Sequence, residues 1–153
     1  MSKGPRLVII SDTHGFHDQI DIPSGDILIH AGDFTNQGAP EEVIAFNEFL
    51  KRQSHPHKLV VAGNHDFCFQ DAPEQARAML TGAIYLEDSG IEIEGIHFYG
   101  SPWQPWFMDY AFNLKSEAER AEKWILIPEN TDVLITHAPP FGHGDQVIGG
   151  EYV

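Results

Sequence analysis

At 153 residues the chain has the length of one ordinary domain and can bury a hydrophobic core without disulfides. Its 42% hydrophobic and 21% charged residues are typical of a globular protein and exclude general disorder. Nine Lys and Arg against 23 Asp and Glu give a formal net charge of −14, which argues against binding to a nucleic-acid polymer. The single cysteine fits a reducing compartment. Because the sequence contains neither a signal-peptide core nor a stretch that could span a bilayer, we expect a cytoplasmic protein without membrane contact.

Four short apolar runs lead directly into polar residues that could bind a metal ion. They are Arg6–Ser11 before Asp12, Asp26–Ala31 before Gly32 and Asp33, Lys58–Ala62 before Gly63 and Asn64, and Asp132–Thr136 before His137. Such runs are typical of buried strands that open into loops. The sequence therefore predicts four strands, each with a candidate ligand at its carboxyl end.

Helical patterns and a hairpin lie between these strands. Pro40 and the acidic residues after it predict a helix start, and one face of this helix is apolar: Val43, Phe46, Phe49 and Leu50. Two more helices are predicted over Pro73–Leu80 and Ser116–Ile125, and a hairpin over Ile91–Ile93 and Ile96–Tyr99. This order of elements predicts an α/β domain with its functional residues at strand carboxyl ends.

Five polar residues at these junctions could bind metal together: Asp12, His14, Asp33, Asn64 and His137. In extended backbone, the side chains of Asp12 and His14 would project to the same side of the chain. Gly32 would let the backbone come close to whatever Asp33 binds, and the two oxygens of Asp33 could bridge two ions. The mixed nitrogen and oxygen ligands suit Mn, Fe, Zn or Co.

Each of these residues also has an ordinary structural explanation. Asp and Asn are common in turns, and a His near a strand end is usually just hydrogen-bonded. Four strand-to-ligand junctions in one short chain are nevertheless hard to explain by turn chemistry alone. We therefore interpret the set as a metal site.

In chain order, these residues resemble the motifs of calcineurin-like metallophosphoesterases. The motifs D-x-H, G-D, G-N-H-[DE] and H-x-P-P are matched by Asp12-Thr13-His14, Gly32-Asp33, Gly63-Asn64-His65-Asp66 and His137-Ala138-Pro139-Pro140. The segment Gly100–Trp106 resembles one branch, the small metallophosphoesterase-domain-containing proteins. The resemblance runs from Leu7 to about Gly144 and implies a two-sheet β-sandwich flanked by helices.

The resemblance also implies a site with two divalent metal ions. One ion would be held by Asp12, His14 and Asp33, and the other by Asp33, Asn64 and His137. The expected reaction is hydrolysis of a phosphoester by a hydroxide that bridges the metals, with His65 as the proton donor to the leaving oxygen. Asp66 is expected to orient His65. Small diester or nucleotide substrates are favoured over phosphoproteins because of the branch resemblance.

The family's later G-H-x-H motif, whose two histidines complete the metal shells, is missing from this sequence. The one later histidine, His143, follows His137 too closely to replace it and is left out of the ligand set. We therefore expect residues 1–153 to form a single metallophosphoesterase domain without its C-terminal strands. The alternative is a truncated metal-binding scaffold or pseudoenzyme with little turnover. The open sheet edge predicts a homodimer.

The remaining histidines and tryptophans are interpreted as structural. We expect His30 and His97 to be core or edge residues of strands, His55 and His57 to lie in a polar loop, and His17 to be exposed to solvent. Trp103 and Trp106 are expected to pack, although they could instead wall a pocket for a base or another aromatic group. The P-loop and serine-hydrolase motifs are absent.

Overall fold

Two facing β-sheets and a layer of helices make up the computed structural model, which describes residues 4–140 and 142–146. The four-stranded sheet is parallel, in the order β1 (Leu7–Ile10), β2 (Ile27–Ala31), β3 (His57–Val61) and β4 (Ile84–Tyr85). The second sheet has the order β5 (Ser89–Ile93), β6 (Ile96–Ser101) and β9 (Val133–Thr136). A small ladder joins β7 (Gln104–Pro105) to β8 (Asn113–Leu114).

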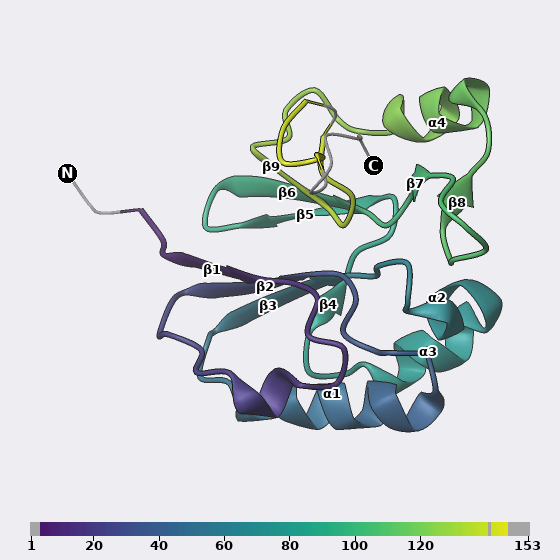
Figure 1. The fold of residues 1–153 in the computed structure, drawn as a ribbon. Coiled ribbons are helices and arrows are strands. Elements are labelled where there is room, and N and C mark those ends of the chain that lie inside the picture. The colour runs from purple at the N-terminus through teal and green to yellow at the C-terminus, as the bar shows by residue number, and fades with distance from the viewer. Residues whose placement is uncertain (1–3, 141, 147–153) are drawn as a thin grey trace.

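Helices cover the outer face of the parallel sheet. They are α1 (Pro40–Arg52), α2 (Phe67–Asp71) and α3 (Pro73–Met79), while α4 (Glu117–Trp124) flanks the second sheet and a short 3-10 turn spans His17–Gln19 (Figure 1). The helix α1 packs on the sheet through its predicted apolar face, which is fully buried there. No helix among the described residues is both long and apolar enough to cross a membrane.

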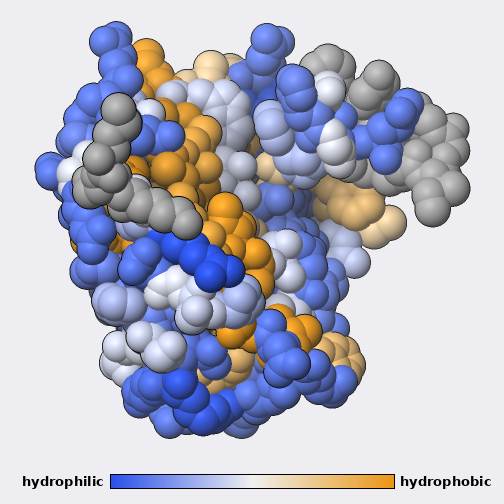
Figure 2. Space-filling model, turned by 90° about the vertical axis from the view of Figure 1, so that its left-hand side faces the viewer, coloured by the Kyte–Doolittle hydropathy of each residue, from blue (hydrophilic) through white to orange (hydrophobic). Residues whose placement is uncertain are grey.

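The core has two parts, one on each face of the parallel sheet. Alternate residues of β2 point to opposite sides, so Leu28 packs under the helices while Ile27 and Ile29 pack against the second sheet. Seen from the side on which β1 lies in Figure 1, hydrophobic residues form an interrupted band between hydrophilic ones (Figure 2).

This architecture confirms the predicted α/β class and the two-sheet arrangement. The four predicted strands and three predicted helices are present within one or two residues of their expected ends, and the hairpin is β5–β6. Four elements that are five residues or shorter were not predicted from the sequence: α2, β4, β7 and β8. Elements this short have no periodicity of their own, so their pattern could not predict them.

Candidate metal centre

The polar residues that follow four strands meet at one edge of the molecule. Asp12, Asp33 and Asn64 follow β1, β2 and β3, and His137 reaches the same place from β9 of the second sheet. His137 Nε2 lies 2.9 Å from Asn64 Oδ1, although the two residues are far apart in sequence. The carboxyl ends of the parallel strands β1, β2 and β3 share one edge of their sheet, which is why the sequence pattern could predict that Asp12, Asp33 and Asn64 meet.

Two groups of side chains have the spacing that a metal ion needs. Asp12, Asp33 and His137 form one group, and His14, Asp33 and His65 form the other, with candidate ligand atoms in each group within 4.8 Å of one another. Asp33 belongs to both groups. The distances thus bring Asp12 together with His137 and His14 together with His65, whereas the sequence-based assignment gave Asp12 and His14 to the same ion.

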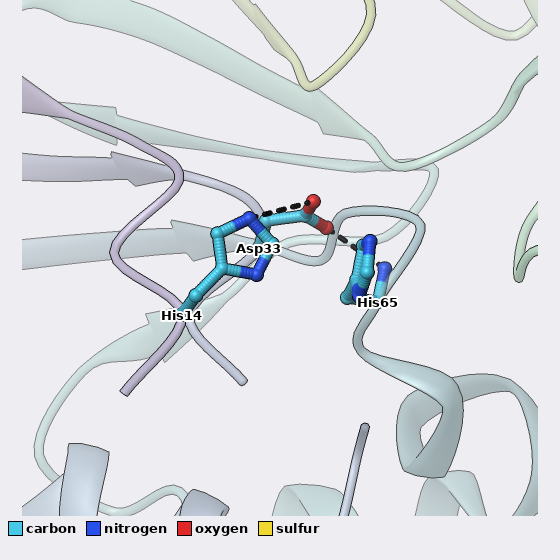
Figure 3. Close-up of side chains that lie close together, drawn as sticks. All are labelled: His14, Asp33 and His65. Atoms are coloured by element: carbon cyan, nitrogen blue, oxygen red, sulfur yellow. Dashed lines mark hydrogen bonds and ion pairs between the residues drawn. The ribbon is translucent and has the colours of Figure 1, made fainter. Parts of the chain in front are cut away.

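Asp33 is the centre of this arrangement. Its Oδ2 lies 3.5 Å from Nε2 of His14, and its Oδ1 accepts a hydrogen bond of 2.8 Å from the backbone nitrogen of His65 (Figure 3). The same Oδ2 lies 3.5 Å from Nε2 of His137. Burial alone would raise the pKa of Asp33, but the hydrogen bonds and charges of His137 and His65 together outweigh burial, so the pKa lies below its ordinary value. The carboxylate is therefore ionised at neutral pH, as a metal ligand must be.

His137 is held at both ring nitrogens. Nδ1 lies 3.0 Å from the carbonyl oxygen of Ala31, while Nε2 faces Asn64 and Asp33. Burial acts to lower the pKa of His137, but the hydrogen bond and charge of Asp33 act in the opposite direction. The net effect raises the pKa from its ordinary value of 6.5 to about 8. When Nδ1 donates to the Ala31 carbonyl, Nε2 is the nitrogen available to a metal, which is the orientation that outer hydrogen bonds usually impose on ligating histidines.

The backbone at three predicted ligands is left-handed. The φ angles are 55° at Asp12, 41° at His14 and 57° at Asp33, a conformation that costs non-glycine residues about 1–3 kcal/mol each. The expectation of extended backbone at Asp12 and His14 is therefore wrong. The two loops are instead fixed by backbone hydrogen bonds, including 3.0 Å from Asp12 N to Gly32 O and 2.9 Å from His14 N to Asp33 O.

Two glycines allow these loops to approach one another. A Cβ at Gly63 would collide with the carboxylate and backbone of Asp33, and a Cβ at Gly32 would lie 2.7 Å from Nδ1 of His137. Any side chain at either position would displace a ligand. Glycine is therefore required at both positions, because only a residue without a side chain fits there.

Asp66 is completely buried behind the ligands. Its carboxylate accepts hydrogen bonds from the backbone nitrogens of Gly63 (2.7 Å), Asp33 (2.9 Å) and Thr35 (2.9 Å), and from Thr35 Oγ1 (2.7 Å). Burial raises its pKa to about 6 against the opposing effect of these bonds. Asp66 therefore joins the loops that carry the ligands.

The contact that orients His65 comes from Asn36 and not, as expected, from Asp66. His65 Nδ1 lies 2.8 Å from the carbonyl oxygen of Asn36. Asn36 is held in turn by Glu42 of α1, whose Oε1 accepts a 2.8 Å hydrogen bond from Asn36 N. Thr35 and Asn36 could not be predicted, because nothing in the sequence marks a residue that acts through a buried hydroxyl or through its backbone carbonyl.

The other histidines and tryptophans fit the expectations only in part. His30 is buried in the core and His97 is exposed beside Asp132, as expected. His17 is only 3% exposed and packs between Phe46 and Phe49, so the expectation of solvent exposure is wrong.

The predicted loop is present at His55, between α1 and β3, although His55 is buried against the Pro23 carbonyl. The prediction is wrong for His57, which begins β3. Trp103 packs on Phe112 and lines an apolar cavity of about 430 Å³, whereas Trp106 is exposed. In the described part of the chain, His143 belongs to neither ligand group.

Comparison with known proteins defines the class. The sequence model of the calcineurin-like phosphoesterase family matches residues 5–152. The chain therefore belongs to the calcineurin-like phosphoesterase family, and the predicted resemblance is confirmed. The description of this family supports a metal-dependent phosphoesterase in general terms as the function to propose for the chain.

Within the family, the chain is similar to metallophosphoesterase domain-containing protein 1 of Homo sapiens and of Mus musculus. Each is 44% identical over 165 residues, which cover 93% of this chain and 51% of the relative. UPF0046 protein K07C11.7 of Caenorhabditis elegans is 44% identical over 155 residues, covering 92% of this chain and 53% of the relative. The chain thus spans about half the length of these curated relatives.

Proposed function

We propose that this chain hydrolyses small phosphoesters, phosphodiesters or nucleotides, with two divalent metal ions held around Asp33. The observation that supports two ions most directly is that Asp33 belongs to both ligand groups. A carboxylate has two oxygens, so a single aspartate can serve two ions at once. A second support is the family membership of the chain.

The side chains at the site fit such ions. Two carboxylates, from Asp12 and Asp33, stand beside the imidazoles of His14 and His137 and the amide oxygen of Asn64. This mixture of oxygen and nitrogen ligands suits Mn, Fe, Zn or Co. When bound, two such ions supply a hydroxide nucleophile at neutral pH and neutralise charge on the phosphoryl oxygens.

Residues of the protein position the metal ligands and transfer the proton. Asp33 keeps the ligand groups together, and the Ala31 carbonyl fixes the ring of His137. His65 is the group proposed to donate a proton to the leaving oxygen. Because Nδ1 of His65 faces the Asn36 carbonyl, Nε2 is the nitrogen free to exchange that proton. The same ring lies within ligand distance of His14 and Asp33, so direct metal binding by His65 is the competing role.

The strongly acidic surface is compatible with this proposal. A net charge of −14 repels polyanions, but two bound cations would make one cleft locally attractive to a phosphate. The site, rather than the surface, would then select small substrates. A cytoplasmic location remains a proposal that agrees with the single cysteine.

Metal titration combined with a turnover assay tests the proposed function. Metal-free protein is titrated with Mn²⁺ or Zn²⁺ while bound metal is measured by elemental analysis, and 4-nitrophenyl phosphate and bis(4-nitrophenyl) phosphate are supplied as substrates. Turnover that rises with the second equivalent of metal is the expected result. Two bound equivalents without turnover of either ester would instead favour the metal-binding scaffold.

A further inference from the structure

A row of rings leads from the candidate metal centre to the loop of residues 106–113. His14 and His65 meet edge to face with ring centroids 4.7 Å apart, and the ring of Tyr110 lies 4.8 Å from that of His65. Tyr110 in turn stacks on Phe107, with centroids 5.9 Å apart and an angle of 8° between the ring planes. The ring pair Tyr110–Phe107 therefore continues the site beyond His65.

The loop that carries this ring pair is fixed to the metal centre. Ala111 N donates a 3.0 Å hydrogen bond to the carbonyl oxygen of Asn64, a candidate ligand. The side chain of Asn113 accepts a 3.1 Å bond from Phe107 N and donates a 2.9 Å bond to Met108 O. The ring pair thus has a set position relative to the ligands, as a binding surface requires.

Apolar side chains on this loop are left open to solvent. The exposed fractions are 53% for Trp106, 48% for Phe107 and 57% for Met108. Three consecutive exposed apolar residues beside a polar site are typical of a surface that contacts a ligand. A polar cavity of about 250 Å³ also opens at this loop, lined by Gln70, Trp106, Asp109, Tyr110, Asn113 and Lys115.

We propose that Tyr110 and Phe107 bind a planar aromatic ring carried by the leaving group, so that phosphoesters with an aromatic leaving group are the preferred substrates. This inference rests on the proposed function, in which His65 protonates the leaving oxygen. Hydrolysis breaks the bond from phosphorus to that oxygen, and water overall adds hydroxide to phosphorus and a proton to the leaving oxygen. The leaving group must therefore lie within hydrogen-bond reach of His65, and Tyr110 is the next ring in the row.

The test uses substrates that differ only in the aromatic ring. Benzyl phosphate and cyclohexylmethyl phosphate, each also supplied as its methyl diester, have primary alcohol leaving groups of similar size and acidity. The wild type should prefer the benzyl ester by about three- to tenfold in kcat/KM, the size of one aromatic pair contact. Tyr110→Leu should remove this preference, whereas the matched variant Tyr110→Phe should retain it.

A binding measurement separates this inference from the proposed function. The corresponding non-hydrolysable phosphonates are titrated calorimetrically into Mn²⁺-loaded wild type and Tyr110→Leu. If the wild type hydrolyses none of the esters, the proposed function fails, but a phosphonate preference that disappears in Tyr110→Leu still supports the aromatic contact. Equal binding of both phosphonates by the wild type, or a preference that survives in Tyr110→Leu, would overturn it.

Discussion

The buried carboxylate of Asp66 accepts a 2.9 Å hydrogen bond from the backbone nitrogen of Asp33, the residue shared by both ligand groups. The same carboxylate holds the backbone nitrogen of Gly63, next to the candidate ligand Asn64. The loops after β2 and β3 are therefore joined through one side chain. The position of two candidate ligands thus depends on a residue that does not itself face the metal centre.

This relationship predicts the effect of Asp66→Asn. The amide NH₂ would face backbone donors that now meet a carboxylate, so buried N–H groups would lose their acceptors. We expect a loss of about 2–4 kcal/mol in the free energy of unfolding, together with weaker metal binding. Urea unfolding and metal titration measure the two effects. The control Asp18→Asn, at an exposed position, should change the free energy of unfolding and metal binding only a little. If Asp66→Asn has the stability and metal affinity of the wild type, Asp66 does not connect the two loops.

Asp33 and His65 should separate metal binding from turnover. Asp33→Asn removes the charge shared by both ligand groups, so we expect loss of both metal equivalents. His65→Ala removes a proton donor and should keep the metal while slowing turnover by about 10²–10⁴-fold. Elemental analysis and initial rates measure the two properties, with the exposed His97→Ala as control.

Two results would change the assignment of these residues. Retention of two full equivalents of metal by Asp33→Asn would exclude the bridging role. Loss of an equivalent in His65→Ala would show that His65 is a ligand, as its distance from Asp33 and His14 permits.

The ligand positions could be predicted from the sequence because they depend on local pattern. Apolar runs that end in Asp12, Asp33, Asn64 and His137 indicate strands. The carboxyl ends of the parallel strands before Asp12, Asp33 and Asn64 share one edge of their sheet, whereas His137 reaches the site from the second sheet. The left-handed backbone at Asp12 could not be predicted in this way, because it is imposed by a hydrogen bond to Gly32, which is remote in sequence.

The burial of His17 and the contact of Tyr110 with His65 could not be predicted from the sequence either. His17 is polar and follows a glycine-containing turn, which favours exposure, but α1 supplies Phe46 and Phe49 to cover it. Tyr110 lies beside His65 because the next residue of its loop, Ala111, hydrogen-bonds to Asn64, which is remote in the sequence. Such contacts between distant segments leave no periodic signal in a single sequence.

His30 should make the fold sensitive to acid. Burial holds its pKa at about 3, with the neighbouring charges of His17 and His137 acting in the same direction, against an ordinary value of 6.5. Between these values the unfolded chain binds a proton that the folded chain does not, so stability falls as the pH falls. The cost approaches about 1.4 kcal/mol per pH unit.

The variant His30→Gln isolates this effect. It can keep a hydrogen bond to Thr13 Oγ1, but it does not titrate. Urea unfolding between pH 6.5 and 4.5, with a chelator present throughout, should give a shallower slope of stability against pH for His30→Gln than for the wild type. Parallel slopes for His30→Gln and the wild type would rule out His30 as the acid-sensitive group.

Self-association, expected from the sequence, can be tested at β1. Among the described strands β1 is an edge of the parallel sheet, and Ile9 pairs in register with Ile29. By alternation Ile9 faces the same side as Ile29, towards the second sheet, yet it is 62% exposed while Ile29 is buried. An uncovered apolar residue on an edge strand favours pairing with a second copy.

Sedimentation over a wide range of protein concentration should therefore reveal a reversible dimer. Ile9→Ser should weaken its association constant by at least about tenfold, because each of two symmetry-related isoleucines would lose buried area. The control Ile125→Ser replaces an isoleucine that is 81% exposed at the end of α4 and should leave association unchanged. A single monomeric species at every concentration, with a melting temperature independent of concentration, would show that Ile9 is simply an exposed side chain.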